Sequence, residues 1–171
     1  MSCVHVYTGD GKGKTTASLG LLLRAAGAGH AVRVFQFLKR GETCELKTLA
    51  GRFPEVEVEQ LGSGRFIDPE NIPAEERARA ADGFAKAREA VLCGRYDLVI
   101  LDEINGAVAM GLVPEGDVLR LMGDRPERTE MVLTGRGAPE AVIAAADLCT
   151  EMRMVKHYYD KGVPARKGIE E

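Results

Sequence analysis

Residues 8–16 of the chain read Thr-Gly-Asp-Gly-Lys-Gly-Lys-Thr-Thr and follow a short, mostly apolar stretch at residues 3–8. After them, residues 14–28 carry leucines at helical spacing. Closely spaced glycines between a strand and a helix let backbone N–H groups point inward, and the N-terminus of the helix adds a positive dipole end. The segment therefore predicts a phosphate-binding loop at the start of a P-loop α/β fold.

Within this loop, Lys14 is expected to place its ammonium on the phosphates, and Thr15 is expected to offer its hydroxyl to Mg²⁺. The usual pattern has glycine where this chain has Thr8, so we expect the nucleotide to be held differently from that of an ordinary NTPase. The alternative is a glycine-rich turn that only connects strand and helix. The nucleotide-binding residues predicted here are Gly9, Asp10, Gly11, Lys12, Gly13, Lys14, Thr15 and Thr16, together with Arg24 on the following helix.

The rest of the chain alternates short apolar runs with longer helical patterns, which is typical of repeated βαβ units. A continuous apolar run before Asp102 predicts a central parallel strand that is buried on both faces. We expect a single α/β domain over residues 1–171, with a mostly parallel sheet flanked by helices. The expected strands are 3–8, 31–38, 56–61, 96–101, 131–134 and 148–155, and the expected helices are 14–28, 74–92, 115–122 and 139–146; a polar stretch follows residue 38, and an irregular tail occupies 156–171.

Two carboxylates, Asp102 and Glu103, end the central apolar strand. Ligands of open α/β sheets bind at the carboxyl ends of the strands, and an aspartate in this place commonly holds Mg²⁺ beside a phosphate loop. We assign Thr15, Asp102 and Glu103 to the metal site. Glu103 either activates a water molecule or orients one bound to the metal. A solvated acidic pair at a strand end is the alternative reading.

The segment Gly135-Arg136-Gly137 follows another predicted strand. Flanking glycines give Arg136 room to approach an anion, so a triphosphate contact is predicted. A surface arginine is the plainer alternative. The basic tail, with Lys156 and Lys161 among its cations, either lies along a polyanion or is simply solvated, and His157 is expected to be structural.

The bulk properties narrow the function further. The 171 residues carry a net charge of −3, which argues against a nucleic-acid-binding domain. The four cysteines have no metal-ligand spacing, and Cys3, Cys93 and Cys149 lie in or beside apolar runs, where we expect reduced thiols packed as small hydrophobes. No leader pattern and no membrane-length apolar run is evident, so a cytoplasmic location without membrane contact is expected.

Six segments together resemble a known family. They are 8–16, Gln36-Phe37-Leu38-Lys39, Leu101-Asp102-Glu103-Ile104-Asn105, Leu133-Thr134-Gly135-Arg136-Gly137, Val155-Lys156-His157 and Lys167-Gly168-Ile169-Glu170. In this order and spacing they resemble the ATP:corrinoid adenosyltransferases of the CobO/BtuR type, whose substrates are cob(I)alamin or cob(I)yrinic acid a,c-diamide. The resemblance covers nearly the whole chain.

The resemblance implies that a Co(I) corrinoid attacks the ribose C5′ of ATP and expels the whole triphosphate. It also implies that the nucleotide lies reversed in the loop, which accounts for Thr8. No general base is required, because cobalt supplies the electron pair. The protein aligns the reactants and stabilises charge on the leaving group. The catalytic residues implied are Lys14, Asp102 with Mg²⁺, Glu103 and Arg136.

Family members help the corrinoid reach Co(I) by excluding its lower axial ligand with apolar side chains. In the matching loop this chain has Phe66 and Ile67, which are therefore expected to bind the corrinoid. A loop anchor packed on the core is the alternative for Phe66. The resemblance further implies a homodimer and an electron-donating partner, either a reductase or a flavodoxin-type protein. Some members carry an N-terminal helix over the corrinoid, and a more open site is expected here.

Two other functions compete with this one. A P-loop kinase or NTPase would use Glu103 to activate water or a substrate hydroxyl, and it would produce ADP. A binding module would hold ATP and corrinoid without forming a cobalt–carbon bond. The Thr8 substitution and the late Lys-Gly-Ile-Glu stretch count against the kinase, whereas the complete phosphate loop makes the carrier the weaker choice.

Overall fold

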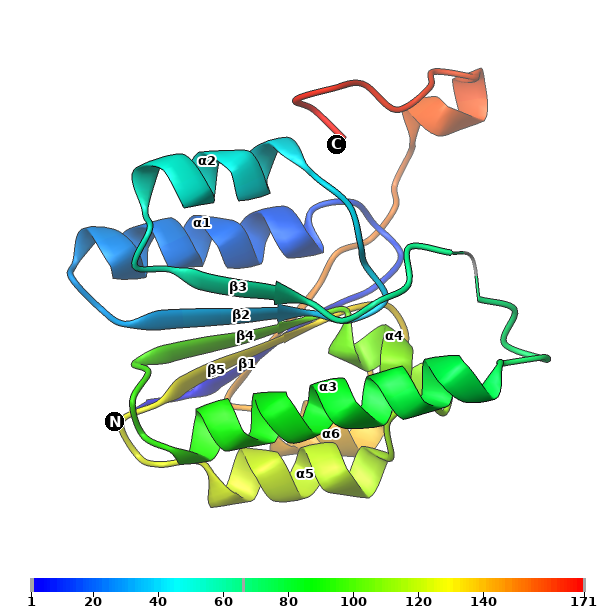
Figure 1. The fold of residues 1–171 in the computed structure, drawn as a ribbon. Helices are drawn as coiled ribbons and strands as arrows, with labels where there is room; N and C mark the ends of the chain where they lie inside the picture. The colour runs from blue at the N-terminus through cyan, green and yellow to red at the C-terminus, as the bar shows by residue number, and fades with distance from the viewer. Residues whose placement is uncertain (1, 66, 171) are drawn as a thin grey trace.

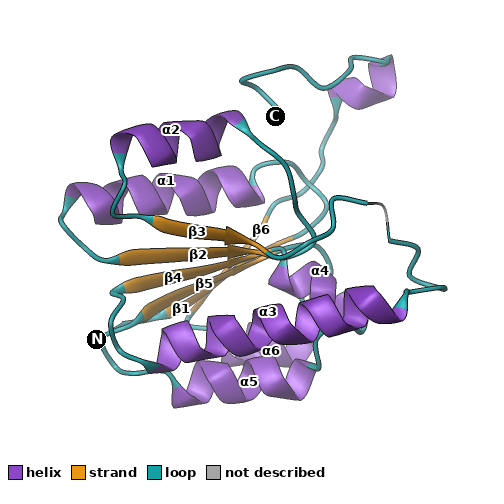
Figure 2. Ribbon diagram, viewed as in Figure 1, coloured by secondary structure: helices purple, strands orange, loops and turns teal. Residues whose placement is uncertain are grey.

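The computed structural model describes residues 2–65 and 67–170, which form a three-layer α/β fold around one twisted sheet (Figures 1 and 2). The six strands of the sheet lie in the order β3-β2-β4-β5-β1-β6, and every neighbouring pair is parallel. The strands are β1 (Val4–Thr8), β2 (Val32–Gln36), β3 (Glu57–Gln60), β4 (Leu98–Asp102), β5 (Glu130–Thr134) and β6 (Leu148–Glu151). The predicted fold class is confirmed.

Helices cover both faces of the sheet. Helices α1 (Lys14–Gly27) and α2 (Cys44–Arg52) lie on one face, and α3 (Ala74–Leu92), α4 (Ile104–Ala109), α5 (Glu115–Asp124) and α6 (Glu140–Ala145) lie on the other (Figure 1). A short 3₁₀ helix, η1 (Tyr158–Lys161), belongs to the C-terminal segment. This layering explains why β4 is apolar at four successive positions, since both of its faces are covered.

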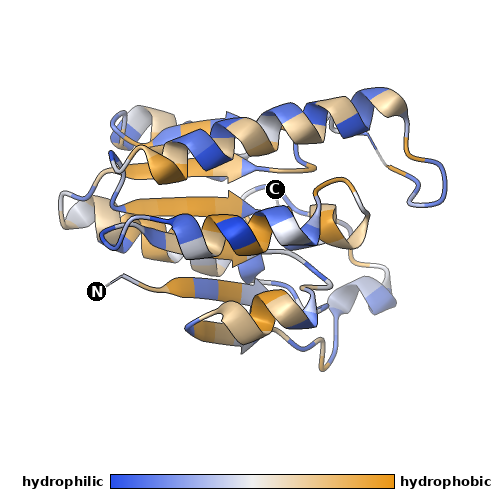
Figure 3. Ribbon diagram, turned by 90° about the horizontal axis from the view of Figure 1, so that it is seen from below, coloured by the Kyte–Doolittle hydropathy of each residue, from blue (hydrophilic) through white to orange (hydrophobic). Residues whose placement is uncertain are grey.

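Two apolar clusters hold the layers together. The larger joins the sheet to α3, α4, α5 and α6, and includes Phe35, Phe84 and Leu121. The smaller joins it to α1 and α2 through Leu22 and Leu49. The hydropathy colouring agrees, because the strands are mostly hydrophobic whereas the helices alternate in colour along their length (Figure 3). Burial of these side chains is the main force that stabilises the fold.

The connection from β1 to β2 positions the site. These two strands are not neighbours, since β5 and β4 lie between them. Helix α1 therefore crosses over both central strands, and its first turn comes beside the end of β4. All six carboxyl ends share one edge of the sheet, where ligands of open α/β folds bind.

Several boundaries differ from the expected ones. The polar stretch after residue 38 contains α2, because Leu46 and Leu49 pack on the smaller cluster. The short helix α4 was not predicted, since six residues carry too little periodicity to be recognised. The last strand stops at Glu151 and not at residue 155, because its partner β1 ends opposite it at Thr8. The expected helix at 74–92 is confirmed.

The cysteine expectation was partly wrong. Cys93 and Cys149 are exposed, whereas Cys3 is half-buried, so two of these three thiols do not pack as small hydrophobes. Cys149 lies on β6, an edge strand whose four residues are all exposed. Because no helix of the described residues covers β6, its apolar side chains stay exposed, unlike those of a central strand. All four thiols are free.

Candidate active site

The loop after β1 is held against the segment that follows β6. The Gly11 N–H donates to the Met152 carbonyl oxygen at 2.6 Å. A Cβ at Gly9 or at Gly11 would lie 2.5 or 2.6 Å from that same oxygen, so no other residue fits at either position. Thr8, where the usual pattern has glycine, is buried, and its hydroxyl accepts from the Ala138 N–H at 3.2 Å. The loop is therefore supported by backbone from both neighbouring connections.

Lys14 opens helix α1 and folds back over its own loop. Its Nζ donates to the carbonyl oxygens of Gly9 and Gly11 at 2.6 and 2.8 Å. Burial lowers the pKa of the Lys14 ammonium, and the nearby Glu103 carboxylate opposes part of that shift. A cation that is largely desolvated in this way binds an anion more strongly than one in water does.

Asp102, at the end of β4, is the centre of the polar network. Its side chain is only 1% exposed. One carboxylate oxygen accepts from the hydroxyls of Thr15 and Thr134 at 2.9 and 2.7 Å. The other accepts from Gln36 Nε2 at 3.1 Å and from Lys39 Nζ at 2.8 Å. The structure thus brings together Thr15 and Asp102, which the sequence assigned to one metal site. Asp102 has three further partners, Thr134, Gln36 and Lys39, that were not predicted as site residues.

The donor set at this point fits Mg²⁺. A threonine hydroxyl and a carboxylate are the hard oxygen ligands that this ion prefers. The Lys39 ammonium already contacts both, at 2.7 Å from Thr15 Oγ1 and 2.8 Å from Asp102 Oδ2, so the local chemistry favours a cation. In the described part of the chain, no group of three or more His, Cys, Asp or Glu side chains is arranged to hold a metal. Mg²⁺ commonly binds through one or two protein oxygens, with substrate phosphates and water completing its shell.

Glu103 has an unusual backbone. Its φ of 62° lies in the left-handed region, and it caps the start of α4. Its N–H donates to Thr134 Oγ1 at 3.0 Å, which stabilises this strained conformation. Burial raises the pKa of the Glu103 carboxyl, while the Lys39 ammonium acts in the opposite direction. Glu103 therefore faces the cavity as a partly desolvated acid, close to Lys14 and Lys39.

Lys12 is held by the C-terminal segment. Its Nζ donates to Glu170 Oε1 and to the Tyr158 hydroxyl, each at 2.8 Å. The Glu170 carboxylate also accepts from Arg166. Arg166, Lys12 and Tyr158 together lower the pKa of Glu170, and Glu170 raises that of Lys12. The predicted irregular tail thus returns to the phosphate loop, although 158 residues separate Lys12 from Glu170.

These groups surround an open cavity of about 1230 Å³ at the carboxyl edge of the sheet. This exceeds the usual 300–1,000 Å³ of a site for one drug-sized ligand, so there is room for more than a nucleotide. Arg136 lines it from the loop after β5 and makes a long contact of 3.5 Å with the Asp10 carbonyl oxygen. Its other lining residues include Asp10, Gly11, Lys12, Gly13, Lys14, Thr15, Thr16, Lys39, Glu103, His157, Tyr159 and Ile169.

Two of the predicted ligand residues do not line this cavity. Arg24 lies exposed in the last turn of α1 and is not among the lining residues of this cavity. Ile67 is half-buried and packs against the larger core cluster. The prediction for Phe66 lies outside the described residues. Lys39, Gln36 and Thr134 were missed as site residues, although each stands at or just after the carboxyl end of a strand.

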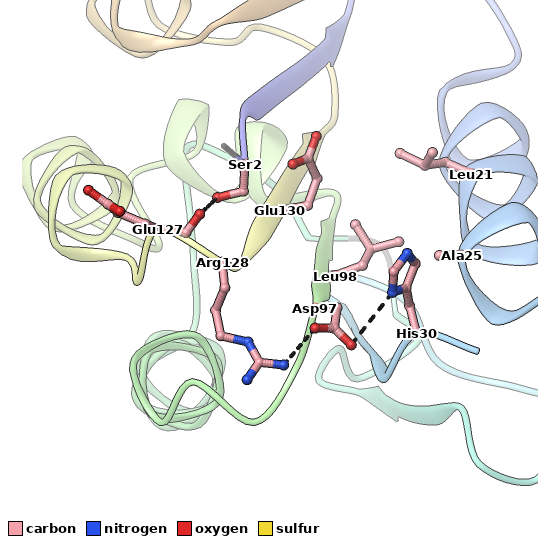
Figure 4. Close-up of a pocket in the computed structure, with 9 residues that line it drawn as sticks. All are labelled: Ser2, Leu21, Ala25, His30, Asp97, Leu98, Glu127, Arg128 and Glu130. Carbon is pink, nitrogen blue, oxygen red and sulfur yellow. Dashed lines mark hydrogen bonds and ion pairs between the residues drawn. The ribbon is translucent and has the colours of Figure 1, made fainter. Parts of the chain in front are cut away.

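A second hollow, of about 300 Å³, lies at the opposite edge of the sheet (Figure 4). Asp97 is at its centre and accepts from Arg128 Nη2 at 2.7 Å and from the Ala31 N–H at 2.9 Å. The Arg128 hydrogen bond and the Ala31 N–H lower the pKa of Asp97. Glu130, on the same hollow, is paired with His5 at 2.7 Å. The carboxylates of Asp97 and Glu130 are thus already hydrogen-bonded within the protein, which leaves little for a ligand to bind.

None of the described helices combines the length and the apolar character needed to cross a bilayer.

Comparison with known proteins assigns the family. The family model of the ATP:corrinoid adenosyltransferases BtuR/CobO/CobP matches residues 1–170. A corrinoid adenosyltransferase of Sinorhizobium sp. is 37% identical over 170 residues, covering 98% of this chain and 79% of the relative. One from Escherichia coli (strain K12) is 34% identical over 171 residues, covering 98% and 84%.

A further relative, an uncharacterised protein of Nostoc sp., is 36% identical over 168 residues. The match covers 90% of this chain but only 44% of that relative, which is therefore much longer. The family model matches almost every residue, and the glycine-rich loop, Asp102 and Arg136 gather at one edge of the sheet, so the chain belongs to the ATP:corrinoid adenosyltransferase BtuR/CobO/CobP family of enzymes.

Proposed function

We propose that this protein transfers the 5′-deoxyadenosyl group of ATP to the Co(I) centre of a corrinoid, in adenosylcobalamin biosynthesis or salvage. The main support for this proposal is the family match over residues 1–170. The cluster of cations around the phosphate loop supports it, since the reaction expels a strongly anionic triphosphate. The corrinoid is cobalamin or cobyrinic acid a,c-diamide.

In the transfer, the cobalt electron pair forms the cobalt–carbon bond as the bond between C5′ and the α-phosphate oxygen breaks. The triphosphate leaves with the electrons of that bond, and cobalt is formally oxidised from Co(I) to Co(III). Lys14 and Arg136 stabilise the charge that grows on the leaving group. Backbone N–H groups of the loop would bind the phosphates, apart from that of Gly11, which donates to the Met152 carbonyl oxygen.

Mg²⁺, when bound, neutralises phosphate charge and orients the triphosphate. Thr15 and Asp102 would hold it, since their oxygens already face a cation. Glu103 would act on the water shell of the metal, not as a general base for the transfer. Its raised pKa and its place on the cavity wall support a role beside charged ligands.

We infer further that the chain acts as one domain in the cytoplasm, as a homodimer, and receives electrons from a reductase or flavodoxin-type protein. The free cysteines of the described residues support a reducing compartment. The uncovered edge strand β6 and the exposed Val155 provide a surface for a partner.

The test mixes purified protein, Mg-ATP and chemically reduced cob(I)alamin in the dark without oxygen. The absorbance spectrum and the phosphate products are followed together. We expect light-sensitive adenosylcobalamin and free triphosphate in equal amounts. Accumulation of ADP without a cobalt–carbon bond would overturn the proposal in favour of an NTPase. A parallel reaction with cob(I)yrinic acid a,c-diamide decides which corrinoid is preferred.

A further inference from the structure

Lys39 is positioned by backbone strain. It follows β2, and the residue before it, Leu38, has a φ of 58° in the left-handed region, which is costly for a leucine. Gly62 packs directly on this turn: its N–H donates to the Lys39 carbonyl oxygen at 3.1 Å, and a Cβ there would overlap the backbone of Leu38 and Lys39. The left-handed conformation of Leu38 and the packing of Gly62 therefore both fix the backbone that directs Lys39 toward the site.

The Lys39 ammonium occupies the position between the two oxygens assigned to the metal. It donates to Thr15 Oγ1 at 2.7 Å and to Asp102 Oδ2 at 2.8 Å. The remaining acceptor positions of Asp102 are taken by Thr15, Thr134 and Gln36. A carboxylate offers about four such positions, so Lys39 completes the set.

We propose that Lys39 is the resident counter-cation of this site, and that Mg²⁺ arriving with ATP displaces its ammonium toward the triphosphate. The inference rests on the proposed function, because it concerns the metal and the leaving group of that reaction. An ammonium and a divalent ion cannot share these oxygens, since Mg²⁺ requires contacts of about 2.0–2.1 Å on all of its ligands and like charges repel.

The lysine side chain is suited to such a movement. It is 34% exposed and lines the cavity, so the ammonium can turn away from Asp102 without crossing the core. Four flexible methylene groups carry it, and its three donors rotate freely. In the nucleotide-free protein the displaced ammonium would have only the partly desolvated Glu103 carboxylate nearby, which Lys14 also faces, and no phosphate. Mg²⁺ alone is therefore expected to bind weakly, whereas Mg²⁺ with triphosphate binds well.

The test measures binding of Mn²⁺, a paramagnetic substitute for Mg²⁺, by electron paramagnetic resonance in the absence of nucleotide and corrinoid. The variants are Lys39→Met, which keeps the stem but not the charge, and Lys39→Arg, which keeps the charge. Lys86→Met is the matched control, because Lys86 is an ion-paired lysine on α3 that lies outside the site. Thermal melting of each protein, with and without Mg²⁺, provides a second measurement.

We expect Lys39→Met to bind Mn²⁺ at least tenfold more tightly than the wild type, and Lys39→Arg and Lys86→Met to bind it as the wild type does. The Met variant should melt several degrees lower without metal and recover when Mg²⁺ is added. Its affinity for tripolyphosphate in the presence of Mg²⁺ should fall about tenfold. Unchanged or weaker Mn²⁺ binding by Lys39→Met would overturn the inference.

If Lys39→Met does not fold, Lys39→Gln replaces it, because its amide can still donate to Asp102 without carrying charge. The same tighter Mn²⁺ binding is expected. The adenosyl-transfer assay of the wild type separates the two proposals. A wild type that transfers the adenosyl group, with a Lys39→Met or Lys39→Gln variant that binds Mn²⁺ no more tightly, contradicts this inference alone. A wild type that hydrolyses ATP without alkylating cobalt contradicts the proposed function, and with it this inference.

Discussion

At the amino ends of the strands the main charged side chains are paired with each other, whereas at the carboxyl ends Lys14 and Arg136 line an open cavity without forming an ion pair to any described residue. Asp97 illustrates the first arrangement, with two good donors and a lowered pKa. Lys14 and Glu103 illustrate the second arrangement. Burial lowers the pKa of Lys14 and raises the pKa of Glu103, which in each case favours the uncharged form. At the amino edge the charged groups are paired within the protein, whereas at the carboxyl edge Lys14 and Arg136 remain available to a polyanionic ligand.

Backbone conformation follows the same division. The two non-glycine residues with positive φ in the described chain, Leu38 and Glu103, both lie at the carboxyl edge. Strain of this kind persists where the surrounding structure imposes it and commonly accompanies function. The strain at Leu38 and Glu103 therefore indicates that the site is not arranged for maximal stability, and that burial in the two apolar clusters stabilises the fold.

The largest effect is expected from Lys14→Ala. Lys14 is proposed to stabilise the leaving triphosphate, so its removal should lower kcat for adenosyl transfer by about 10²–10³-fold or more. Relief of the desolvation that lowers the pKa of this ammonium and loss of its hydrogen bonds to Gly9 and Gly11 act in opposite directions, so the free energy of unfolding should change by no more than about 1 kcal/mol. Anaerobic transfer kinetics and urea unfolding measure the two quantities. Lys86→Ala serves as a control, and a kcat near the wild-type value in Lys14→Ala would remove Lys14 from its assigned role.

Gly62→Ala should be the most destabilising of the conservative changes. Its Cβ would overlap the backbone at Leu38 and Lys39, so the free energy of unfolding should fall by roughly 1–3 kcal/mol, and transfer should slow as Lys39 moves.

The matched control for this change is Gly123→Ala. Gly123 lies in α5 with open space around it, so alanine there should stabilise the protein by about 0.5–1 kcal/mol. Urea unfolding of both variants tests the contrast, and equal effects at the two positions would show that the turn at Lys39 is not constrained by packing.

Glu103→Gln should increase stability while impairing the reaction. An acid whose pKa is raised by folding reduces stability at every pH above its folded pKa, and this penalty disappears below the ordinary value of 4.5. The gain should therefore be on the order of 1 kcal/mol at neutral pH and should vanish in acid. Melting temperatures of both proteins from pH 3 to pH 8 measure it, and a pH-independent difference would contradict the electrostatic explanation.

The smallest effect is expected at the paired edge. Asp97→Asn should cost about 0.2–1 kcal/mol at neutral pH, since the ion pair with Arg128 is partly exposed. Folding lowers the pKa of Asp97, so its contribution is complete above the ordinary value of 3.8 and is lost as the pH falls through the folded pKa. Adenosyl transfer should be unchanged. A large loss of activity in Asp97→Asn would show that the two edges are coupled.

Much of the molecule follows from local sequence patterns. The glycine-rich loop, the apolar run before Asp102 and the alanine-rich helix α3 each carry a local signal, because glycine conformation and hydrophobic period act over a few residues. Helices α2 and α4 carried weaker signals, since their burial depends on contacts with distant clusters. Asp102 and Thr15 could be paired in advance only through the known geometry of P-loop proteins.

The residue pattern alone predicted the glycine-rich loop, the acidic strand end and the alternation of strands and helices apart from α2 and α4, because these features depend on short-range chemistry. Only the tertiary structure decided that Lys39 shares Thr15 and Asp102, which lie 24 and 63 residues away, and that Glu170 holds Lys12. It also decided that Arg24 is not among the residues that line the cavity and that Ile67 packs on the core. The physical reason is that a side chain's partner is set by which strands become neighbours, and strand order is a property of the whole chain.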